Sequence, residues 1–210
     1  NFTSHVSDEE AYRFRLPVTI VGHMRREHRG VDTYRMGDKE VQFRRGQKLT
    51  LINIGPSEKV ARGDVGYPIC QVCGGCRSPF ASPLELNTFK ETHKRTCGRE
   101  PGKFALSTDS DVDGLLFVDL PDMEQAVNLL EGLRLAATAT LDMEEDDLHI
   151  VHLPRGDGRV DSFLYDPMPG GSGLLEQMLE RWPELVEMGR RALKECPAQC
   201  QKSCYDCLRS

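Results

Sequence analysis

Eight cysteines fall into two groups of four, and their spacing is that of metal ligands. The C-terminal group has the pattern C-x3-C-x3-C-x2-C and consists of Cys196, Cys200, Cys204 and Cys207. Thiolates at this density need a covalent or metal partner, and tetrahedral Zn²⁺ is the usual one. Because no secretion signal precedes them, the cysteines favour metal binding over disulfides. We therefore predict a structural zinc knot at this end of the chain.

A second zinc site is predicted from Cys70, Cys73, His93 and Cys97. Glycines after Cys73 let the backbone bend close to a thiolate. A helix expected over residues 84–96 carries His93 and delivers Cys97 at its end. Cys76 is an alternative to His93 as the fourth ligand, although the H-x3-C spacing favours His93. Two zinc ions per chain are expected, and four protein ligands at each leave no open position for catalysis.

The composition is that of a globular protein: 210 residues, 39% of them hydrophobic and 29% charged. No apolar run is long enough to cross a membrane, so no membrane partner is expected. The N-terminal sequence lacks the order of a signal peptide and an initiator Met. A reducing, cytoplasmic location follows, and the chain is expected to be a piece of a longer protein.

The pattern of apolar residues predicts an α+β fold in two parts. Residues 1–100 are expected to form a small β-rich segment with the Cys/His zinc site, including a hairpin that turns at Arg45-Gly46. Residues 101–210 are expected to form a mixed sheet with two long helices, closed by the zinc knot. Within them, Asp109–Gly114 is interpreted as an acidic turn and Gly156–Gly158 as the turn of a hairpin.

The segment from Gly170 to Gly173 is the main candidate for anion binding. A glycine-rich loop that leads into a helix presents free amides to a phosphate, here through Gly170, Gly171 and Ser172, although a tight packing turn is the simpler interpretation. No GxxxxGK[ST] motif occurs, and Ser172 lacks the second glycine of a nucleophile elbow. No catalytic constellation is found, so the chain is not expected to be an enzyme by itself.

The net charge of −6 argues against a general polycation for nucleic acid. The first part of the chain is locally basic, however, and a solvated, charge-mixed surface is the alternative. The candidates for contact with a nucleic-acid backbone are Arg25, Arg26, Arg29, Arg44, Arg45 and Lys94.

The end of the chain resembles the MrfA-like zinc-binding domain. The likeness rests on Tyr165-Asp166-x3-Gly170-Gly171-Ser172-Gly173, a long helix and the knot of four cysteines, and it extends over about residues 103–207. That domain occurs at the C-terminal end of superfamily 2 DEAD/DEAH-box helicases and in DrmB of the DISARM antiphage system. The resemblance implies an accessory domain whose ATPase lies in separate RecA-like domains, which are absent here.

Two functions are therefore expected from different classes. The first is a zinc-binding accessory domain of a helicase-like DNA-processing or antiphage defence protein, with DNA and the helicase domains or a defence-complex subunit as partners. The alternative is a structural module that binds a partner subunit and no nucleic acid.

Overall fold

The structure is a computed structural model that describes residues 18–36 and 39–194. The chain divides into two compact units. The first unit contains Leu51–Thr108 and the N-terminal segment up to Val21, and the second contains Gly22–Thr50 and the chain from Asp109 onward. The division into domains 1–100 and 101–210 stays a prediction.

A six-stranded sheet has the order β1-β3-β6-β8-β7, and β2 also pairs with β3. The pairs β2–β3, β6–β8 and β7–β8 are antiparallel. The strands are β1 (Val18–Met24), β2 (Gly30–Met36), β3 (Lys39–Pro56), β6 (Leu106–Leu120), β7 (His149–Pro154) and β8 (Val160–Asp166). Since β1, β3 and β6 are long, each contributes residues to both units.

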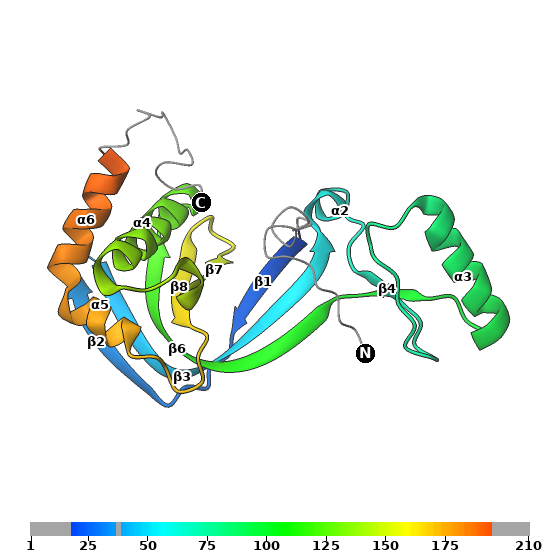
Figure 1. Ribbon diagram of the computed structural model, residues 1–210, viewed down its shortest axis with the longest axis horizontal. Helices are drawn as coiled ribbons and strands as arrows, with labels where there is room; N and C mark the ends of the chain where they lie inside the picture. Colours follow the sequence, from blue (N-terminus) through cyan, green and yellow to red (C-terminus); the bar gives the residue numbers. More distant parts are fainter. Residues whose placement is uncertain (1–17, 37–38, 195–210) are drawn as a thin grey trace. The chain divides into compact units, whose positions relative to one another are not determined.

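In the second unit, helices cover one face of the sheet (Figure 1). They are α4 (Met123–Leu141), α5 (Leu174–Glu180) and α6 (Trp182–Lys194), with the short 3-10 turn η1 (Glu145–Asp147) after α4. Asp122 caps the start of α4 by accepting a hydrogen bond from the backbone of Gln125. The core between helices and sheet is a single apolar cluster that includes Phe43, Leu115, Leu130, Leu164, Met178 and Leu185.

The first unit holds smaller elements: α2 (Ser57–Ala61), a two-stranded sheet of β4 (Tyr67–Ile69) and β5 (Gly102–Phe104), and α3 (Pro83–Cys97). Ser82 and Glu85 form a reciprocal capping box at the start of α3. Gly98 ends the helix in the left-handed conformation. Local sequence signals therefore define both ends of the helix that carries His93 and Cys97.

The fold class predicted from the sequence is confirmed: the chain is α+β with a large sheet. The β7–β8 hairpin turns at residues 155–159, as expected from its two glycines. The last long helix is divided at Arg181 into α5 and α6. In the part of the chain that the structure describes, no helix is long and apolar enough to cross a membrane.

Two predicted turns are wrong, because both segments are continuous strand. Arg45-Gly46 lies inside β3, and the hairpin turns instead between β2 and β3. Gly46 has a φ of +55°, a conformation that favours glycine. It therefore allows a local irregularity within the strand rather than a turn. Asp109–Gly114 lies inside β6, where the side chains of Asp109 and Asp113 find hydrogen-bond partners on distant segments.

Gly114 provides a test of packing across β6 and β8. A Cβ at this buried position would contact the ring of Phe163 and lie 2.9 Å from the carbonyl oxygen of Leu164. We expect Gly114→Ala to lower the free energy of unfolding of the second unit by about 1–3 kcal/mol, the usual cost of overpacking. Gly156→Ala is the matched control, since nothing lies within 4 Å of its added Cβ. Urea denaturation of both variants measures the difference, and equal midpoints would contradict the packing.

Candidate metal centre

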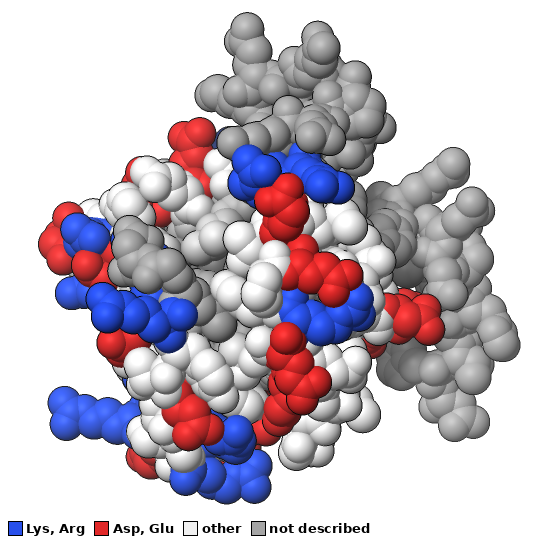
Figure 2. All heavy atoms as spheres, turned by 90° about the vertical axis from the view of Figure 1, so that its left-hand side faces the viewer, with Lys and Arg blue, Asp and Glu red and all other residues white. Residues whose placement is uncertain are grey.

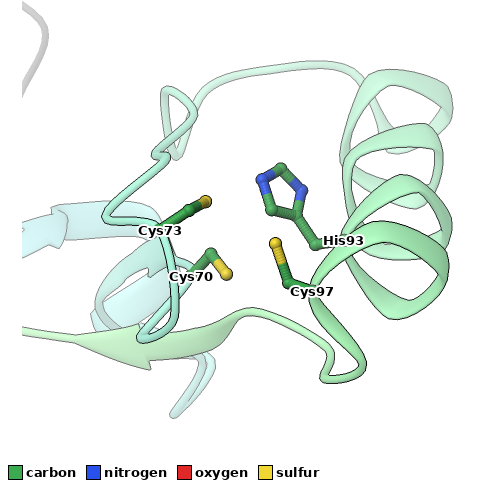
Figure 3. A group of neighbouring side chains, drawn as sticks. All are labelled: Cys70, Cys73, His93 and Cys97. Carbon is green, nitrogen blue, oxygen red and sulfur yellow. The ribbon is translucent and has the colours of Figure 1, made fainter.

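Cys70, Cys73, His93 and Cys97 come together in the first unit. Their ligand atoms all lie within 4.8 Å of one another. Figure 3 shows two thiols approaching from the turn after β4 and the imidazole with the third thiol from the end of α3. Residues far apart in the sequence thus converge from two short elements, and no other such group occurs among the described residues.

The turn that carries the first two cysteines is fixed by its own backbone. Cys70 donates its N–H to the carbonyl of Gly75 and accepts at its carbonyl from Gly74, both at 2.8 Å. The N–H of Gly75 points to the sulfur of Cys73 at 3.4 Å. A Cβ at Gly75 would lie 3.0 Å from Nε2 of His93 and 3.3 Å from Sγ of Cys73, so a side chain there would crowd the ligand atoms. The glycine lets the turn approach the helix.

The same turn favours a thiolate at Cys70. Hydrogen bonds from the backbone of Cys73, and less strongly of Val72, lower the pKa of the Cys70 thiol to about 7, although burial opposes the shift. A thiol that ionises near neutral pH gives up its proton to a metal at low cost, because the thiolate is the ligand form.

The tautomer of His93 follows from its contact with the preceding helical turn. Its Nδ1 lies 2.8 Å from the carbonyl oxygen of Phe89, which can only accept a hydrogen bond. Nδ1 therefore carries the proton, and Nε2 has the free lone pair that a metal requires. The ring of Phe89 packs against the imidazole with centroids 4.2 Å apart.

Three thiolates and one imidazole form a donor set of the kind that holds structural Zn²⁺. Sulfur atoms around an ideal tetrahedral zinc are about 3.8 Å apart, given Zn–S bonds of about 2.3 Å. The separations of up to 4.8 Å are close to that value, so the residues fit zinc after small side-chain adjustments. Cys76 is not in the group; it is exposed and forms an isolated bridge with Ile69.

The first unit has few other sources of stability. Apart from four buried prolines (Pro56, Pro68, Pro79 and Pro101), the buried apolar and cysteine side chains of residues 51–108 are those of Cys70 and Phe89. Both belong to the metal centre, one as a candidate ligand and the other as a support of His93. A segment of this size cannot be stable on so small a core, and a structural metal is the usual remedy.

The predicted C-terminal knot of Cys196, Cys200, Cys204 and Cys207 lies outside the described residues. The metal centre seen here is thus the second of the two predicted sites. The spacing predicts that its four residues are ligands, and their convergence in the structure supports this prediction.

The glycine turn before α5 is organised by the carboxylate of Asp166. This carboxylate is 1% exposed and accepts three hydrogen bonds: from Met168 N at 2.8 Å, Ser172 N at 2.5 Å and Ser172 Oγ at 2.6 Å. Gly170, Gly171 and Gly173 all have φ between +79° and +86°, which explains the glycines. A phosphate role for Gly170, Gly171 and Ser172 stays a prediction, and an anion there would have to displace Asp166 from Ser172.

Several of the predicted nucleic-acid contacts already have partners. Arg25 pairs with Asp109, Arg45 with Asp32 and Lys94 with Glu100. Arg44 hydrogen-bonds to Gln42 and Gln47. Arg26 and Arg29 are exposed, without an ion pair among the described residues. Sequence reasoning could not see the pair of Arg25 with Asp109, because the two residues are 84 positions apart.

Comparisons with known proteins show what the C-terminal part of the chain is similar to. Residues 129–208 match the family model of the MrfA Zn-binding domain. This segment of the chain is similar to that zinc-binding domain. The resemblance predicted from the glycine turn and the C-terminal cysteines is therefore confirmed.

Two curated relatives are similar over part of their length. Over 194 residues the chain is 26% identical to Druantia protein DruE of Escherichia coli (strain UMEA 4076-1), covering 77% of this chain and 10% of DruE. Over 67 residues it is 31% identical to an uncharacterized ATP-dependent helicase, YprA, of Bacillus subtilis (strain 168), covering 31% of this chain and 9% of YprA. The chain thus spans about a tenth of the relatives that it matches.

A solved structure shares the fold. The crystal structure of the DUF1998 helicase MrfA bound to DNA superposes with a TM-score of 0.50 at 14% identity, over 92% of this chain and 23% of MrfA. At this identity the likeness concerns the fold alone. It extends well beyond residues 129–208 and hence takes in the first unit.

Ligand substitutions test the metal centre directly. We expect Cys70→Ser, His93→Ala and Cys97→Ser each to lower the zinc content of the purified protein by about one ion per chain, because three ligands hold structural zinc poorly. Cys76→Ser should retain the full content. Mass spectrometry of acid-released metal gives the number, and zinc loss in Cys76→Ser with retention in His93→Ala would show that Cys76 is the ligand.

Metal removal should affect the two units differently. On chelation we expect residues 51–104 to lose hydrogen-exchange protection, since their small core cannot replace the metal. The strands and helices around Leu130 and Leu164 should keep theirs, because a large apolar cluster supports them. Peptide-resolved hydrogen exchange reports both regions in one experiment. Unchanged protection of α3 and β4 would refute the dependence on metal.

Proposed function

We propose that this chain is a zinc-binding accessory domain of a helicase-like protein in DNA processing or antiphage defence. The observation that carries the proposal is the convergence of Cys70, Cys73, His93 and Cys97 within 4.8 Å. In the proposed role the zinc stabilises a surface, and ATP hydrolysis belongs to other domains of the longer protein. Four protein ligands leave no coordination position for a reacting water, which supports a structural metal.

Two zinc ions per chain are part of the proposal. The matched family segment, residues 129–208, contains Cys196, Cys200, Cys204 and Cys207 but none of the residues of the Cys70–Cys97 group. The group at Cys70–Cys97 supports a metal independently, through its geometry. Two separate lines of argument thus point to two separate sets of ligands.

The charge of the first unit supports nucleic-acid binding. Residues 51–108 contain eight Lys and Arg against five Asp and Glu, although the whole chain has a net charge of −6. Lys90, Arg95 and Arg99 lie on or directly after α3 and have no ion pair among the described residues. Free cations beside a rigid metal centre suit contacts with a phosphate backbone. The related MrfA was crystallised with DNA.

The second unit is less suited to DNA along its helices. On α6, Glu187 lies within 3.0 Å of Arg190 and 3.3 Å of Arg191, and Arg181 pairs with Glu184 at 2.8 Å. Figure 2 shows the corresponding face, where basic and acidic groups alternate. A charge-mixed surface of this kind creates little net field.

A second candidate function is assembly with a partner subunit without contact to nucleic acid. The negative net charge favours it, as does the ion pairing of Arg25 and Arg45. In that case the chain would bind no DNA even at low salt, and removal of the free cations on the first unit would not affect its binding to the partner subunit.

Salt-dependent DNA binding separates these functions. We expect fluorescence anisotropy with a labelled single strand and a duplex to show affinity that falls as salt rises. The triple variant Lys90→Ala/Arg95→Ala/Arg99→Ala should reduce the slope of log affinity against log salt by about 0.7–0.9 for each phosphate that the variant no longer neutralises. Arg181→Ala is the control, since this cation pairs with Glu184. Absence of binding at low salt would sink the nucleic-acid role and leave the assembly role.

A further inference from the structure

Strand β2 has a free edge. In the described part of the chain it pairs with β3 alone, from Gly30↔Arg45 to Met36↔Lys39. Residues 31–35 are all exposed, and they include Val31 at 38% and Tyr34 at 37%. Figure 1 shows β2 along the outer side of β3. The unpaired N–H and C=O groups of such an edge can accept another strand.

A pocket opens at this edge, on the side that faces α5. Its volume is about 250 Å³, and its lining consists of Tyr34, Phe43, Arg45, Glu176, Leu179 and Glu180. Phe43 is fully buried and forms an apolar wall. The space is of the size of one large side chain, and it lies between the edge strand and a helix of the same unit.

The pocket has an excess of negative charge. Glu176 and Glu180 stand one helical turn apart, are exposed, and have no hydrogen bond or ion pair among the described residues. Arg45 is the one cation of the lining, and it already has an ion-pair partner. Its guanidinium pairs with Asp32 and lies 4.4 Å from the centre of the Phe43 ring. Glu176 also attracts Arg45 and helps to raise the pKa of that guanidinium, but one cation faces three carboxylates, Asp32, Glu176 and Glu180, so the edge keeps an excess of negative charge for a cation from outside.

The register of β2 directs an added strand toward these carboxylates. Tyr34 is opposite Val41, and Asp32 is opposite Phe43, so both share the face on which Val41 and Phe43 enter the core. Partners across a ladder lie on the same face, and alternate residues of a strand do so too. Every second side chain of a strand paired with β2 would thus lie on the α5 side of the sheet.

We propose that the β2 edge binds an extended peptide segment and that the pocket takes a Lys or Arg side chain of that segment. Main-chain hydrogen bonds to β2 supply the pairing, and Glu176 with Glu180 supply selection for the cation. The ring of Tyr34 offers a face for its alkyl stem or charge. A nucleic acid does not suit this site, because its phosphates would be repelled by the two carboxylates. The inference does not depend on the proposed DNA-binding role.

The test is selection of peptides from a random twelve-residue display library on the intact chain. We expect enriched peptides to combine β-branched residues with one Lys or Arg at a fixed position. A synthetic copy should protect the amides of residues 30–36 from hydrogen exchange. Replacement of its basic residue by norleucine should weaken binding about tenfold, because norleucine keeps the alkyl stem but cannot make the charge-assisted hydrogen bond.

Matched variants locate the binding site. Glu176→Gln/Glu180→Gln, at exposed positions without a hydrogen bond or ion pair among the described residues, should weaken binding of the basic peptide about tenfold and leave the norleucine peptide unchanged. Glu124→Gln removes one exposed carboxylate from α4 and should change neither. The proposal is overturned if no peptide is enriched or if the enriched peptides lack a basic residue. It is also overturned if the peptide protects amides elsewhere in the chain but not those of β2.

Discussion

The convergence of Cys70, Cys73, His93 and Cys97 is the constraint on which the first unit depends most, and we propose that a metal holds it together. An apolar core normally supplies most of the free energy that offsets chain ordering. Here, apart from four buried prolines, the buried apolar and cysteine side chains of residues 51–108 are only those of Cys70 and Phe89. A metal bound by four residues joins the turn after β4 to the end of α3, which the small sheet of β4 and β5 alone could not do. We therefore expect folding of this unit to be coupled to metal binding.

The second unit is built in the opposite way, with a large core and buried carboxylates at its periphery. Asp166 and Asp113 are paired across β8 and β6, and both are buried. Asp166 binds the glycine turn, while Asp113 accepts a hydrogen bond from Gly46 N at 2.6 Å. Each carboxylate thus satisfies backbone donors of an irregular segment. The Tyr-Asp…Gly-Gly-Ser-Gly signature therefore has a structural reason: its aspartate caps its own turn.

Local chemistry was predictable from the sequence, and long-range pairing was not. The ends of α3 and α4 follow from capping residues, and the Cys70–Cys97 group from ligand spacing, because all these signals lie within a few residues or one motif. Gly46 and the aspartates of 109–113 were interpreted as turns because those residue types favour turns. In the structure Thr50 Oγ1 donates to Asp109 at 2.7 Å, a partner 59 positions away. A single sequence contains no signal for such an interaction.

The same limit governs the interpretation of charge. The cations singled out from the sequence include Arg25, Arg45 and Lys94, each of which has a carboxylate partner in the fold. Exposed pairs of this kind add little stability, about 0–1 kcal/mol, but they cancel most of the field that would attract a phosphate. Cations without an ion pair among the described residues remain in both units: Arg26 and Arg29 in the second, and Lys90, Arg95 and Arg99 on or after α3 in the first. Since attraction acts through uncompensated charge, the cations on and after α3 are where we propose an anionic partner, and the excess of carboxylates at the β2 edge is where we propose a cationic one.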